Sequence, residues 1–127
     1  MSGGRFATAI NCMDGRAQLP VIEWMMREYK VDYVDTITEP GPVLILAQAT
    51  DAVTLESIKH RLSISVTRHG SSRVAIVAHA DCAGNPVDND TQLNQLSMAA
   101  ATVRSWGLDV QLDLLWLGDN WQVERIG

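Results

Sequence analysis

The chain has 127 residues, of which 46% are hydrophobic and 20% are charged, and its net charge is −5 at pH 7. This length is sufficient for one hydrophobic core, and the composition excludes an intrinsically disordered chain. The negative charge argues against nucleic acid or an anionic membrane surface as a partner. We therefore expect a single domain over residues 1–127 that binds a small molecule or another protein, with no nucleic-acid and no membrane partner.

Two further features bear on the compartment. No apolar run is long enough to span a bilayer, and the segment Met1–Ala9 lacks the apolar stretch of a secretory signal. We therefore expect a cytoplasmic protein. The two cysteines, Cys12 and Cys82, are fewer than a disulfide-dependent scaffold usually carries. In a reducing compartment metal ligands or buried inert thiols explain them better, although one bridge closing this long loop remains an alternative.

The first part of the chain predicts a strand, a helix and a second strand. A short strand is expected over Phe6–Asn11, with Cys12 at its carboxyl end. Pro20 suits the first turn of the helix that follows. Helical spacing predicts that one face of this helix is formed by Ile22, Met25, Met26 and Tyr29. The second strand is expected over Tyr33–Ile37.

The middle of the chain predicts a turn, a long helix and a buried strand. Two prolines and a glycine make Glu39–Pro42 a turn, and the apolar run Val43–Ala47 fits either a buried strand or a helix face. A long helix is expected within Asp51–His69, ended by Gly70. Its helical spacing is carried by Leu55, Ile58, Leu62 and Val66. The small and branched residues of Val74–Ala78 predict a central parallel strand covered on both faces.

The last part of the chain predicts a helix and two strands. The helix is expected over Thr91–Trp106 and is stopped by Gly107. Alternating apolar and polar residues predict a strand over Val110–Trp116, and a final short strand is expected over Trp121–Ile126. This alternation of strands and helices predicts an α/β fold with a mostly parallel central sheet of about four to five strands, flanked by helices.

The predicted topology brings distant residues to one crevice. In open α/β sheets, ligands bind beyond the carboxyl ends of the strands, where the strand order reverses. Cys12 follows the first predicted strand and His79 follows the third. If the first strand lies between the second and the third, the loops that carry Cys12 and His79 flank the same crevice.

Two short motifs carry the chemistry, Cys-Met-Asp-Gly-Arg at 12–16 and His-Ala-Asp-Cys at 79–82. Thiolate and imidazole are the ligands that Zn²⁺ prefers, and Cys12, His79 and Cys82 supply three corners of a tetrahedron. A fourth position open to water is the arrangement of a catalytic site. Zinc lowers the pKa of its bound water to about 7, which makes hydroxide available at neutral pH. The motifs therefore predict one Zn²⁺ per chain.

The pattern C-x-D-x-R followed much later by H-x-x-C resembles that of the β-class carbonic anhydrases. The resemblance runs from Phe6 to near Ile126 and includes the helix, strand and ligand loop that end in His79–Gly84. The chain looks like a minimal member without the N-terminal helical extension. The resemblance implies a zinc lyase that interconverts CO₂ and bicarbonate. It also implies a homodimer or a higher even oligomer, because the family's active sites lie at subunit interfaces.

Carried over by position, the resemblance makes Cys12, His79 and Cys82 the zinc ligands and Asp14 and Arg16 the catalytic dyad. A carboxylate that accepts the proton of the hydroxide would aim its lone pair at CO₂, and a bidentate arginine would orient that carboxylate. Some members of the family have a closed state in which the aspartate replaces water on the metal.

The chain departs from the family after the second strand. Many members carry an Arg-Asn-Ala-Gly-like segment there, whereas this chain has Thr-Glu-Pro-Gly-Pro at 38–42. The metal site can be intact while the substrate pocket differs. A related zinc hydrolase acting on CS₂ or COS is therefore an alternative function. A non-catalytic, zinc-stabilised homodimer is a second alternative, which does not need Asp14 and Arg16.

Other polar residues have simpler explanations. Asp14 and Arg16, taken alone, could be a surface ion pair, and either cysteine alone a buried thiol. Asp81 is expected to cap its own loop. His60 is expected on a solvated helix face and His69 near a helix end, where the helix dipole favours a cation. The four tryptophans are expected in the core or at an interface.

Overall fold

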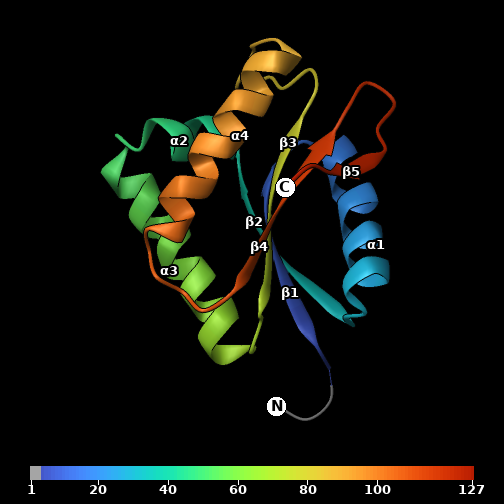
Figure 1. Ribbon diagram of the computed structural model, residues 1–127, viewed down its shortest axis with the longest axis vertical. Helices are drawn as coiled ribbons and strands as arrows, with labels where there is room; N and C mark the ends of the chain where they lie inside the picture. The colour runs from blue at the N-terminus through green and yellow to red at the C-terminus, as the bar shows by residue number, and fades with distance from the viewer. Residues whose placement is uncertain (1–3) are drawn as a thin grey trace.

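Four parallel strands and one antiparallel strand form a single sheet in the order β2-β1-β3-β4-β5 (Figure 1). The structure is a computed structural model that describes residues 4–127. The first three residues, part of the segment expected to carry no secretory signal, lie outside the described residues. In chain order the elements are β1 (Phe6–Cys12), a 3₁₀ turn (Gly15–Ala17), α1 (Gln18–Tyr29), β2 (Tyr33–Glu39), α2 (Pro42–Gln48), α3 (Ala52–Arg68), β3 (Arg73–His79), α4 (Asn89–Arg104), β4 (Gln111–Leu117) and β5 (Val123–Arg125).

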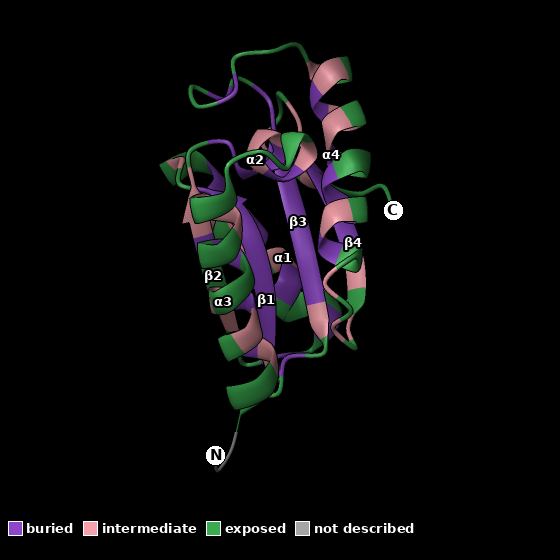
Figure 2. Ribbon diagram, turned by 90° about the vertical axis from the view of Figure 1, so that its left-hand side faces the viewer, coloured by how far each residue is buried: buried purple, intermediate pink, exposed green. Residues whose placement is uncertain are grey.

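Helices cover both faces of the sheet, and the predicted α/β fold with a mostly parallel sheet is confirmed. Helix α1 lies on one face, and α2, α3 and α4 lie on the other (Figure 1). The two central strands β1 and β3 are buried along almost their whole length (Figure 2). Strand β1 lies between β2 and β3, which is the strand order that places the Cys12 and His79 loops beside the same crevice. No helix among residues 4–127 combines the length and the apolar character needed to cross a membrane.

The apolar core has two parts because β1 and β3 are covered on both faces. Alternate side chains along each strand point to opposite faces. On the α2–α4 side the largest fully buried residues include Ile10, Ile58, Leu62, Ile76 and Leu96. On the α1 side the cluster includes Ala9, Val21, Met25, Val77 and Leu115.

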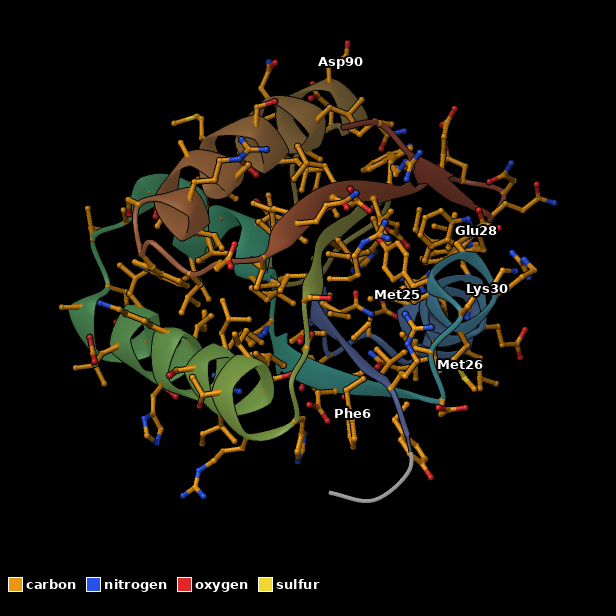
Figure 3. All side chains as sticks on the ribbon, turned by 60° about the horizontal axis from the view of Figure 1, so that its bottom comes forward. Phe6, Met25, Met26, Glu28, Lys30 and Asp90 are labelled. Atoms are coloured by element: carbon orange, nitrogen blue, oxygen red, sulfur yellow. The ribbon has the colours of Figure 1, made fainter. Side chains whose placement is uncertain are left out.

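The predicted apolar face of α1 is partly wrong. Met25 is fully buried, whereas Met26 is 39% exposed, and Figure 3 shows the two side chains pointing in different directions from the helix. The buried residues are Val21, Met25 and Tyr29, which recur at intervals of four. Residues four apart stay on one stripe of an α-helix, while a neighbour lies about 100° around the axis. The adjacent pair Met25 and Met26 therefore could not share that stripe.

The predicted turn over Glu39–Pro42 is too long, since a helix begins inside it. Pro42 is the first residue of α2, where its fixed φ and its missing N–H cost nothing. Gly41, with φ +62°, lies in the left-handed region just before the helix. The apolar run Val43–Ala47 is thus part of a helix that buries Val43 and Leu46.

Side chains cap the starts of α3 and α4, and the predicted glycines mark their ends. The Asp51 and Asp88 carboxylates accept hydrogen bonds from backbone N–H groups of the first turns of α3 and α4. Gly70 and Gly107, just after the two helices, both have positive φ values. Both long helices are therefore confirmed, with bounds shifted by one or two residues.

Strand β4 is confirmed, but its polar face is not fully exposed to solvent in the way that the alternating pattern would suggest. Asp113, on the polar side of the alternating pattern, is only 5% exposed. The Tyr29 hydroxyl donates a 2.6 Å hydrogen bond to Asp113, and Arg73 donates a second bond of 3.2 Å. Burial, together with this carboxylate, raises the pKa of Tyr29. The buried carboxylate is therefore paired by groups from α1 and β3.

Two glycines let the loop after β2 touch the loop after β3. A Cβ at Gly84 would lie 2.6 Å from the carbonyl carbon of Pro40 and 2.9 Å from the nitrogen of Gly41. A Cβ at Gly41 would lie 2.9 Å from the Cβ of Asn85. Backbone-to-backbone contact of this kind excludes any side chain at either position.

We expect Gly84→Ala to lower the free energy of unfolding by about 1–3 kcal/mol, because the two loops must separate to admit the methyl group. Urea denaturation of the metal-free protein measures this change. Gly15→Ala is the matched control, since an added Cβ there meets nothing within 4 Å. Equal stabilities of the two variants would contradict the proposed packing constraint.

Candidate metal centre

Three side chains with metal-binding chemistry meet at the carboxyl edge of the sheet. Cys12 is the last residue of β1, His79 is the last residue of β3, and Cys82 lies in the loop after β3. One donor atom from each lies within 4.8 Å of the other two. The two Sγ atoms are 3.8 Å apart. The exposed fractions are 4% for Cys12, 1% for His79 and 4% for Cys82, so the cluster is almost fully shielded from solvent.

The imidazole of His79 is fixed in the tautomer that a metal ligand requires. Its Nδ1 lies 2.7 Å from the carbonyl oxygen of Ala80, so Nδ1 carries the proton and donates it. Its Nε2 is buried and has no hydrogen-bond partner within the described part of the chain. A buried polar atom without a partner is costly. A lone pair at Nε2, held in place by a bond at Nδ1, is the usual arrangement of a metal-bound histidine.

Backbone and side-chain groups around the sulfur atoms favour a thiolate at Cys12. Burial would raise the pKa of Cys12, but the adjacent imidazole of His79 and the backbone N–H groups of Gly41 and Asp14 lower it to about 7. Burial and the neighbouring Cys12 raise the pKa of Cys82. Without a cation, two negative sulfurs this close repel each other. A divalent cation removes that conflict.

The residues therefore fit a zinc ion. Two thiolates and one neutral imidazole are a donor set suited to Zn²⁺, and the two negative charges balance its double positive charge. Burial opposes the charged form of His79, yet the neighbouring Cys12 sulfur and the Ala80 carbonyl raise its pKa, which indicates that this cluster stabilises a positive charge. The structure thus brings together Cys12, His79 and Cys82, the three residues predicted as ligands.

Asp14 and Arg16 form a bidentate pair directly after the first ligand. Arg16 donates from Nε to Oδ1 of Asp14 at 3.1 Å and from Nη2 to Oδ2 at 2.7 Å. The backbone N–H of Arg16 also donates to Oδ1 at 2.9 Å. These bonds to Arg16 lower the pKa of Asp14 to about 2. The carboxylate is therefore ionised at neutral pH and paired with Arg16 through both of its oxygens.

Arg16 also contacts Asp81, so the expected role of Asp81 as a cap of its own loop is not what the contacts show. Arg16 donates from Nη1 to the Asp81 carboxylate at 3.2 Å and from Nη2 to the Asp81 carbonyl oxygen at 3.1 Å. Asp81 has a φ of +55°, in the left-handed region. The guanidinium thus links the loop after β1 to the loop after β3.

Trp121 is a residue of this site that the sequence argument missed. It lies between β4 and β5, with its ring centroid 4.3 Å from Cζ of Arg16 and 5.7 Å from the centroid of His79. Its φ is +57°, an outlier for a bulky side chain. Such a conformation costs about 1–3 kcal/mol. The one signal in the sequence is a large aromatic residue immediately after the Gly-Asp-Asn turn at 118–120.

A cavity of about 390 Å³ adjoins the cluster, and Cys82 is one of the residues that line it. Arg16 and Asp81 line one part of it, and the apolar residues Ala83, Pro86 and Val87 line another. A small molecule in this cavity would meet an apolar wall, the Arg16 cation and one of the three candidate ligand residues. Of the three, only Cys82 lines the cavity.

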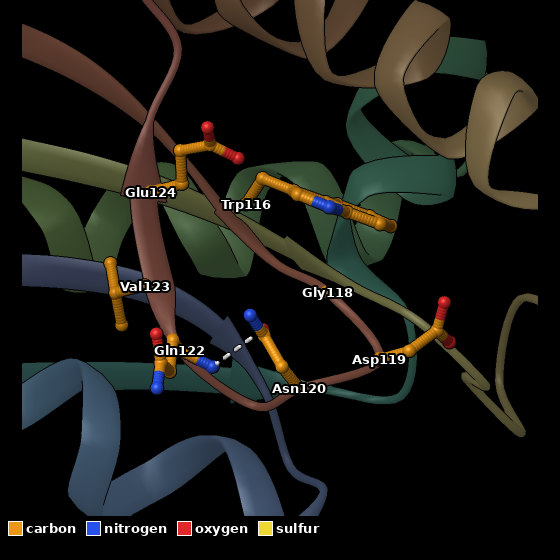
Figure 4. A pocket seen from close by; sticks show the side chains of 7 residues that line it. All are labelled: Trp116, Gly118, Asp119, Asn120, Gln122, Val123 and Glu124. Carbon is orange, nitrogen blue, oxygen red and sulfur yellow. Dashed lines mark hydrogen bonds between the residues drawn. The ribbon is translucent and has the colours of Figure 1, made fainter.

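A second hollow, of about 590 Å³, lies at the β4–β5 hairpin and contains none of the three ligands (Figure 4). Its polar lining includes Asp119, Asn120, Gln122 and Glu124, and Trp116 forms an aromatic wall. The backbone N–H of Gln122 donates to the side chain of Asn120 at 3.1 Å, which closes the turn (Figure 4). The hairpin thus borders this hollow, while its Trp121 faces the metal centre.

The other two histidines are not in the cluster. His69 lies 2.6 Å from the Asp35 carboxylate through Nδ1 and stacks on Phe6. His60 lies on the exposed side of α3. The solvated helix face expected for His60 and the helix end expected for His69 are thus confirmed.

The segment in which the chain departs from the family pattern contributes to the site through its backbone. The N–H of Gly41 helps to lower the pKa of Cys12. The Glu39 carbonyl accepts a 3.0 Å hydrogen bond from Met13, and the Glu39 carboxylate pairs with Arg61 of α3. Residues 38–42 therefore hold the first ligand loop in place.

Comparisons with known proteins agree with this arrangement. Residues 2–127 match the family described as "Putative carbonic anhydrase". The β-carbonic anhydrase isoform I of Trichomonas vaginalis superposes with a TM-score of 0.64 at 15% identity, over 94% of this chain and 81% of that one. The β-carbonic anhydrase CafA of Aspergillus fumigatus superposes with a TM-score of 0.54 at 14% identity, over 94% of this chain and 74% of that one.

A sequence search of curated proteins gives no significant match. The structural likenesses establish the fold, and the family match spans nearly the whole chain. The motifs from which the resemblance was drawn lie inside the matched region and converge at one edge of the sheet. This chain belongs to the β-carbonic anhydrase family.

Proposed function

We propose that the protein is a zinc-dependent carbonic anhydrase that interconverts CO₂ and bicarbonate. The observation that carries the proposal is the cluster of His79, whose buried Nε2 has no hydrogen-bond partner, with two cysteine sulfurs, beside a carboxylate held by a bidentate arginine. Family membership supports the same activity. A zinc ion bound by Cys12, His79 and Cys82 would supply a water molecule with a pKa near 7.

Asp14 and Arg16 have distinct roles in this proposal. The ionised Asp14 accepts a hydrogen bond from the attacking oxygen, so that a lone pair of that oxygen faces the carbon of CO₂. Arg16 fixes the orientation of Asp14 through two parallel hydrogen bonds. The apolar wall of Ala83, Pro86 and Val87 suits a neutral linear substrate, and the nearby cation suits the bicarbonate product.

We also propose that the chain forms a homodimer or a higher even oligomer. Two apolar side chains close to the dyad are largely exposed, Met13 at 63% and Leu19 at 67%. Exposed apolar side chains beside a functional site are typical of a contact surface. A subunit interface there would enclose the site further.

The protein purified without chelators is expected to contain about one zinc per chain by elemental analysis. Cys82→Ser should lower zinc affinity by more than about 100-fold, since losing a ligand costs more than losing a residue that supports one. His79→Ala should do the same, whereas His60→Ala, on an exposed helix face, should keep the full zinc content. Wild-type protein that neither contains zinc nor takes it up would refute the metal centre.

Asp14→Ala is expected to retain zinc and to lower the rate of CO₂ hydration by about 100-fold, a typical loss for one oriented group at a reacting centre. Stopped-flow hydration assays on protein of verified zinc content measure this rate. Arg16→Ala should also lower it, because Asp14 loses its orientation or moves onto the metal. Full activity of zinc-loaded Asp14→Ala would rule out the mechanism. A wild type no faster than free zinc would rule out the carbonic anhydrase proposal and make CS₂ and COS the next substrates to assay.

Sedimentation equilibrium at micromolar concentration is expected to show a dimer or a higher even assembly. Leu19→Asp should shift it towards monomer, because a charge replaces an apolar side chain beside the dyad. Val53→Asp is the matched control, since Val53 is 83% exposed at the start of α3. A monomeric wild type would contradict the proposed assembly.

A further inference from the structure

The ring of Trp121 touches the metal centre although it offers no ligand atom and no hydrogen bond to the dyad. One neighbour is the guanidinium of Arg16, with Cζ 4.3 Å from the ring centroid, and the other is the imidazole of His79, with centroids 5.7 Å apart. We propose that Trp121 is a positioning residue, which holds Arg16 in line with Asp14 and covers His79. The kinetic part of this inference rests on the proposed function, whereas the part concerning metal exchange does not.

Arg16 needs such a support. Its side chain is 49% exposed, and an exposed ion pair by itself orders two flexible side chains only weakly. The hydrogen bonds to Asp14 and Asp81 use the donors around the edge of the guanidinium. They leave its two faces free. Trp121 covers one face, and an indole is the aromatic ring that attracts a cation most strongly.

The backbone at Trp121 supports a functional reason for its position. At φ +57° a glycine or an asparagine would be the ordinary choice. Two hydrogen bonds hold the turn: the Trp121 N–H donates to the Gly118 carbonyl at 2.9 Å, and the Gln122 N–H donates to Asn120. Backbone strain that the surrounding structure maintains is concentrated at functional sites. Here the strained residue directs its ring to Arg16 and His79.

The position over His79 also affects metal exchange. The imidazole is 1% exposed, and Trp121 is one of the side chains packed against the α1-side core near it. An apolar cover over a ligand limits the access of water and of competing ligands to the metal. Removal of the ring should therefore speed zinc loss without removing a ligand.

The first experiment compares zinc-loaded wild type with Trp121→Ala, Trp121→Gly and Trp121→Phe. Trp106→Phe is the control, since Trp106 packs against the core on the α4 side. Transfer of zinc to a chromophoric chelator should be about fivefold faster in Trp121→Ala and Trp121→Gly, a loss in the range of one aromatic contact. Trp121→Phe and Trp106→Phe should stay close to wild type. Glycine tolerates the positive φ, so Trp121→Gly gives the answer even if Trp121→Ala does not fold. Equal rates of zinc transfer in all the proteins that fold would contradict the proposal that Trp121 covers His79 and slows zinc loss.

The second experiment measures CO₂ hydration by the same proteins, by Arg16→Ala and by the double variant. Loss of the Trp121 ring should lower kcat about five- to tenfold with little change in KM, and phenylalanine should restore most of it. If Trp121 acts through Arg16, the double variant should be no slower than Arg16→Ala alone. Additive losses, or a Trp121→Phe variant as slow as Trp121→Ala, would overturn the positioning role. An inactive wild type would contradict the proposed function alone. The zinc-transfer rates would then still test whether Trp121 covers His79.

Discussion

Parallel pairing of β1 with β3 is the constraint on which the metal centre depends. The pairing matches Thr8 with Val74 and Ile10 with Ile76, so both strands end at the same edge of the sheet. Cys12 is therefore brought within reach of the ligands from β3 and its loop without any contribution from a long flexible segment. The pairing is strong because both strands are buried on two faces, which fixes their register. Burial of the strands also keeps the ligand atoms away from water.

Charge balance explains how cysteine thiolates, a carboxylate and a guanidinium can lie together at the carboxyl edge of the sheet. Two buried thiolates would be costly alone, but a Zn²⁺ ion bound by Cys12, His79 and Cys82 would neutralise them. Next to them, Asp14 and Arg16 neutralise each other through a bidentate bond, while the additional carboxylate of Asp81 is 83% exposed and remains hydrated. Arg16 joins these parts, since it contacts both ligand loops and the Trp121 ring. A change at Arg16 therefore affects orientation around the metal more than the fold.

Local signals predicted most elements because they act over a few residues. Gly70 and Gly107 marked the ends of the two long helices through their backbone freedom, whereas the capping carboxylates of Asp51 and Asp88 became evident only in the structure. Helix α2 was left open between a buried strand and a helix face because its seven residues begin inside the Pro-Gly-Pro segment, which is also typical of a turn. The buried stripe of α1 was misjudged because periodicity alone did not exclude Met26.

The sequence by itself determined which residues are candidates for the ligand set and the dyad, because Cys12, Asp14 and Arg16 lie within one short motif and His79 and Cys82 within another, and their chemistry suits zinc. Tertiary structure decided the rest. Only folding orients the Nε2 of His79, brings Asp81 to Arg16 and places Trp121 over both, since these contacts join three separate loops. They depend on strand order, on left-handed backbone positions and on close contact between two glycines, none of which has a periodic signature in the sequence.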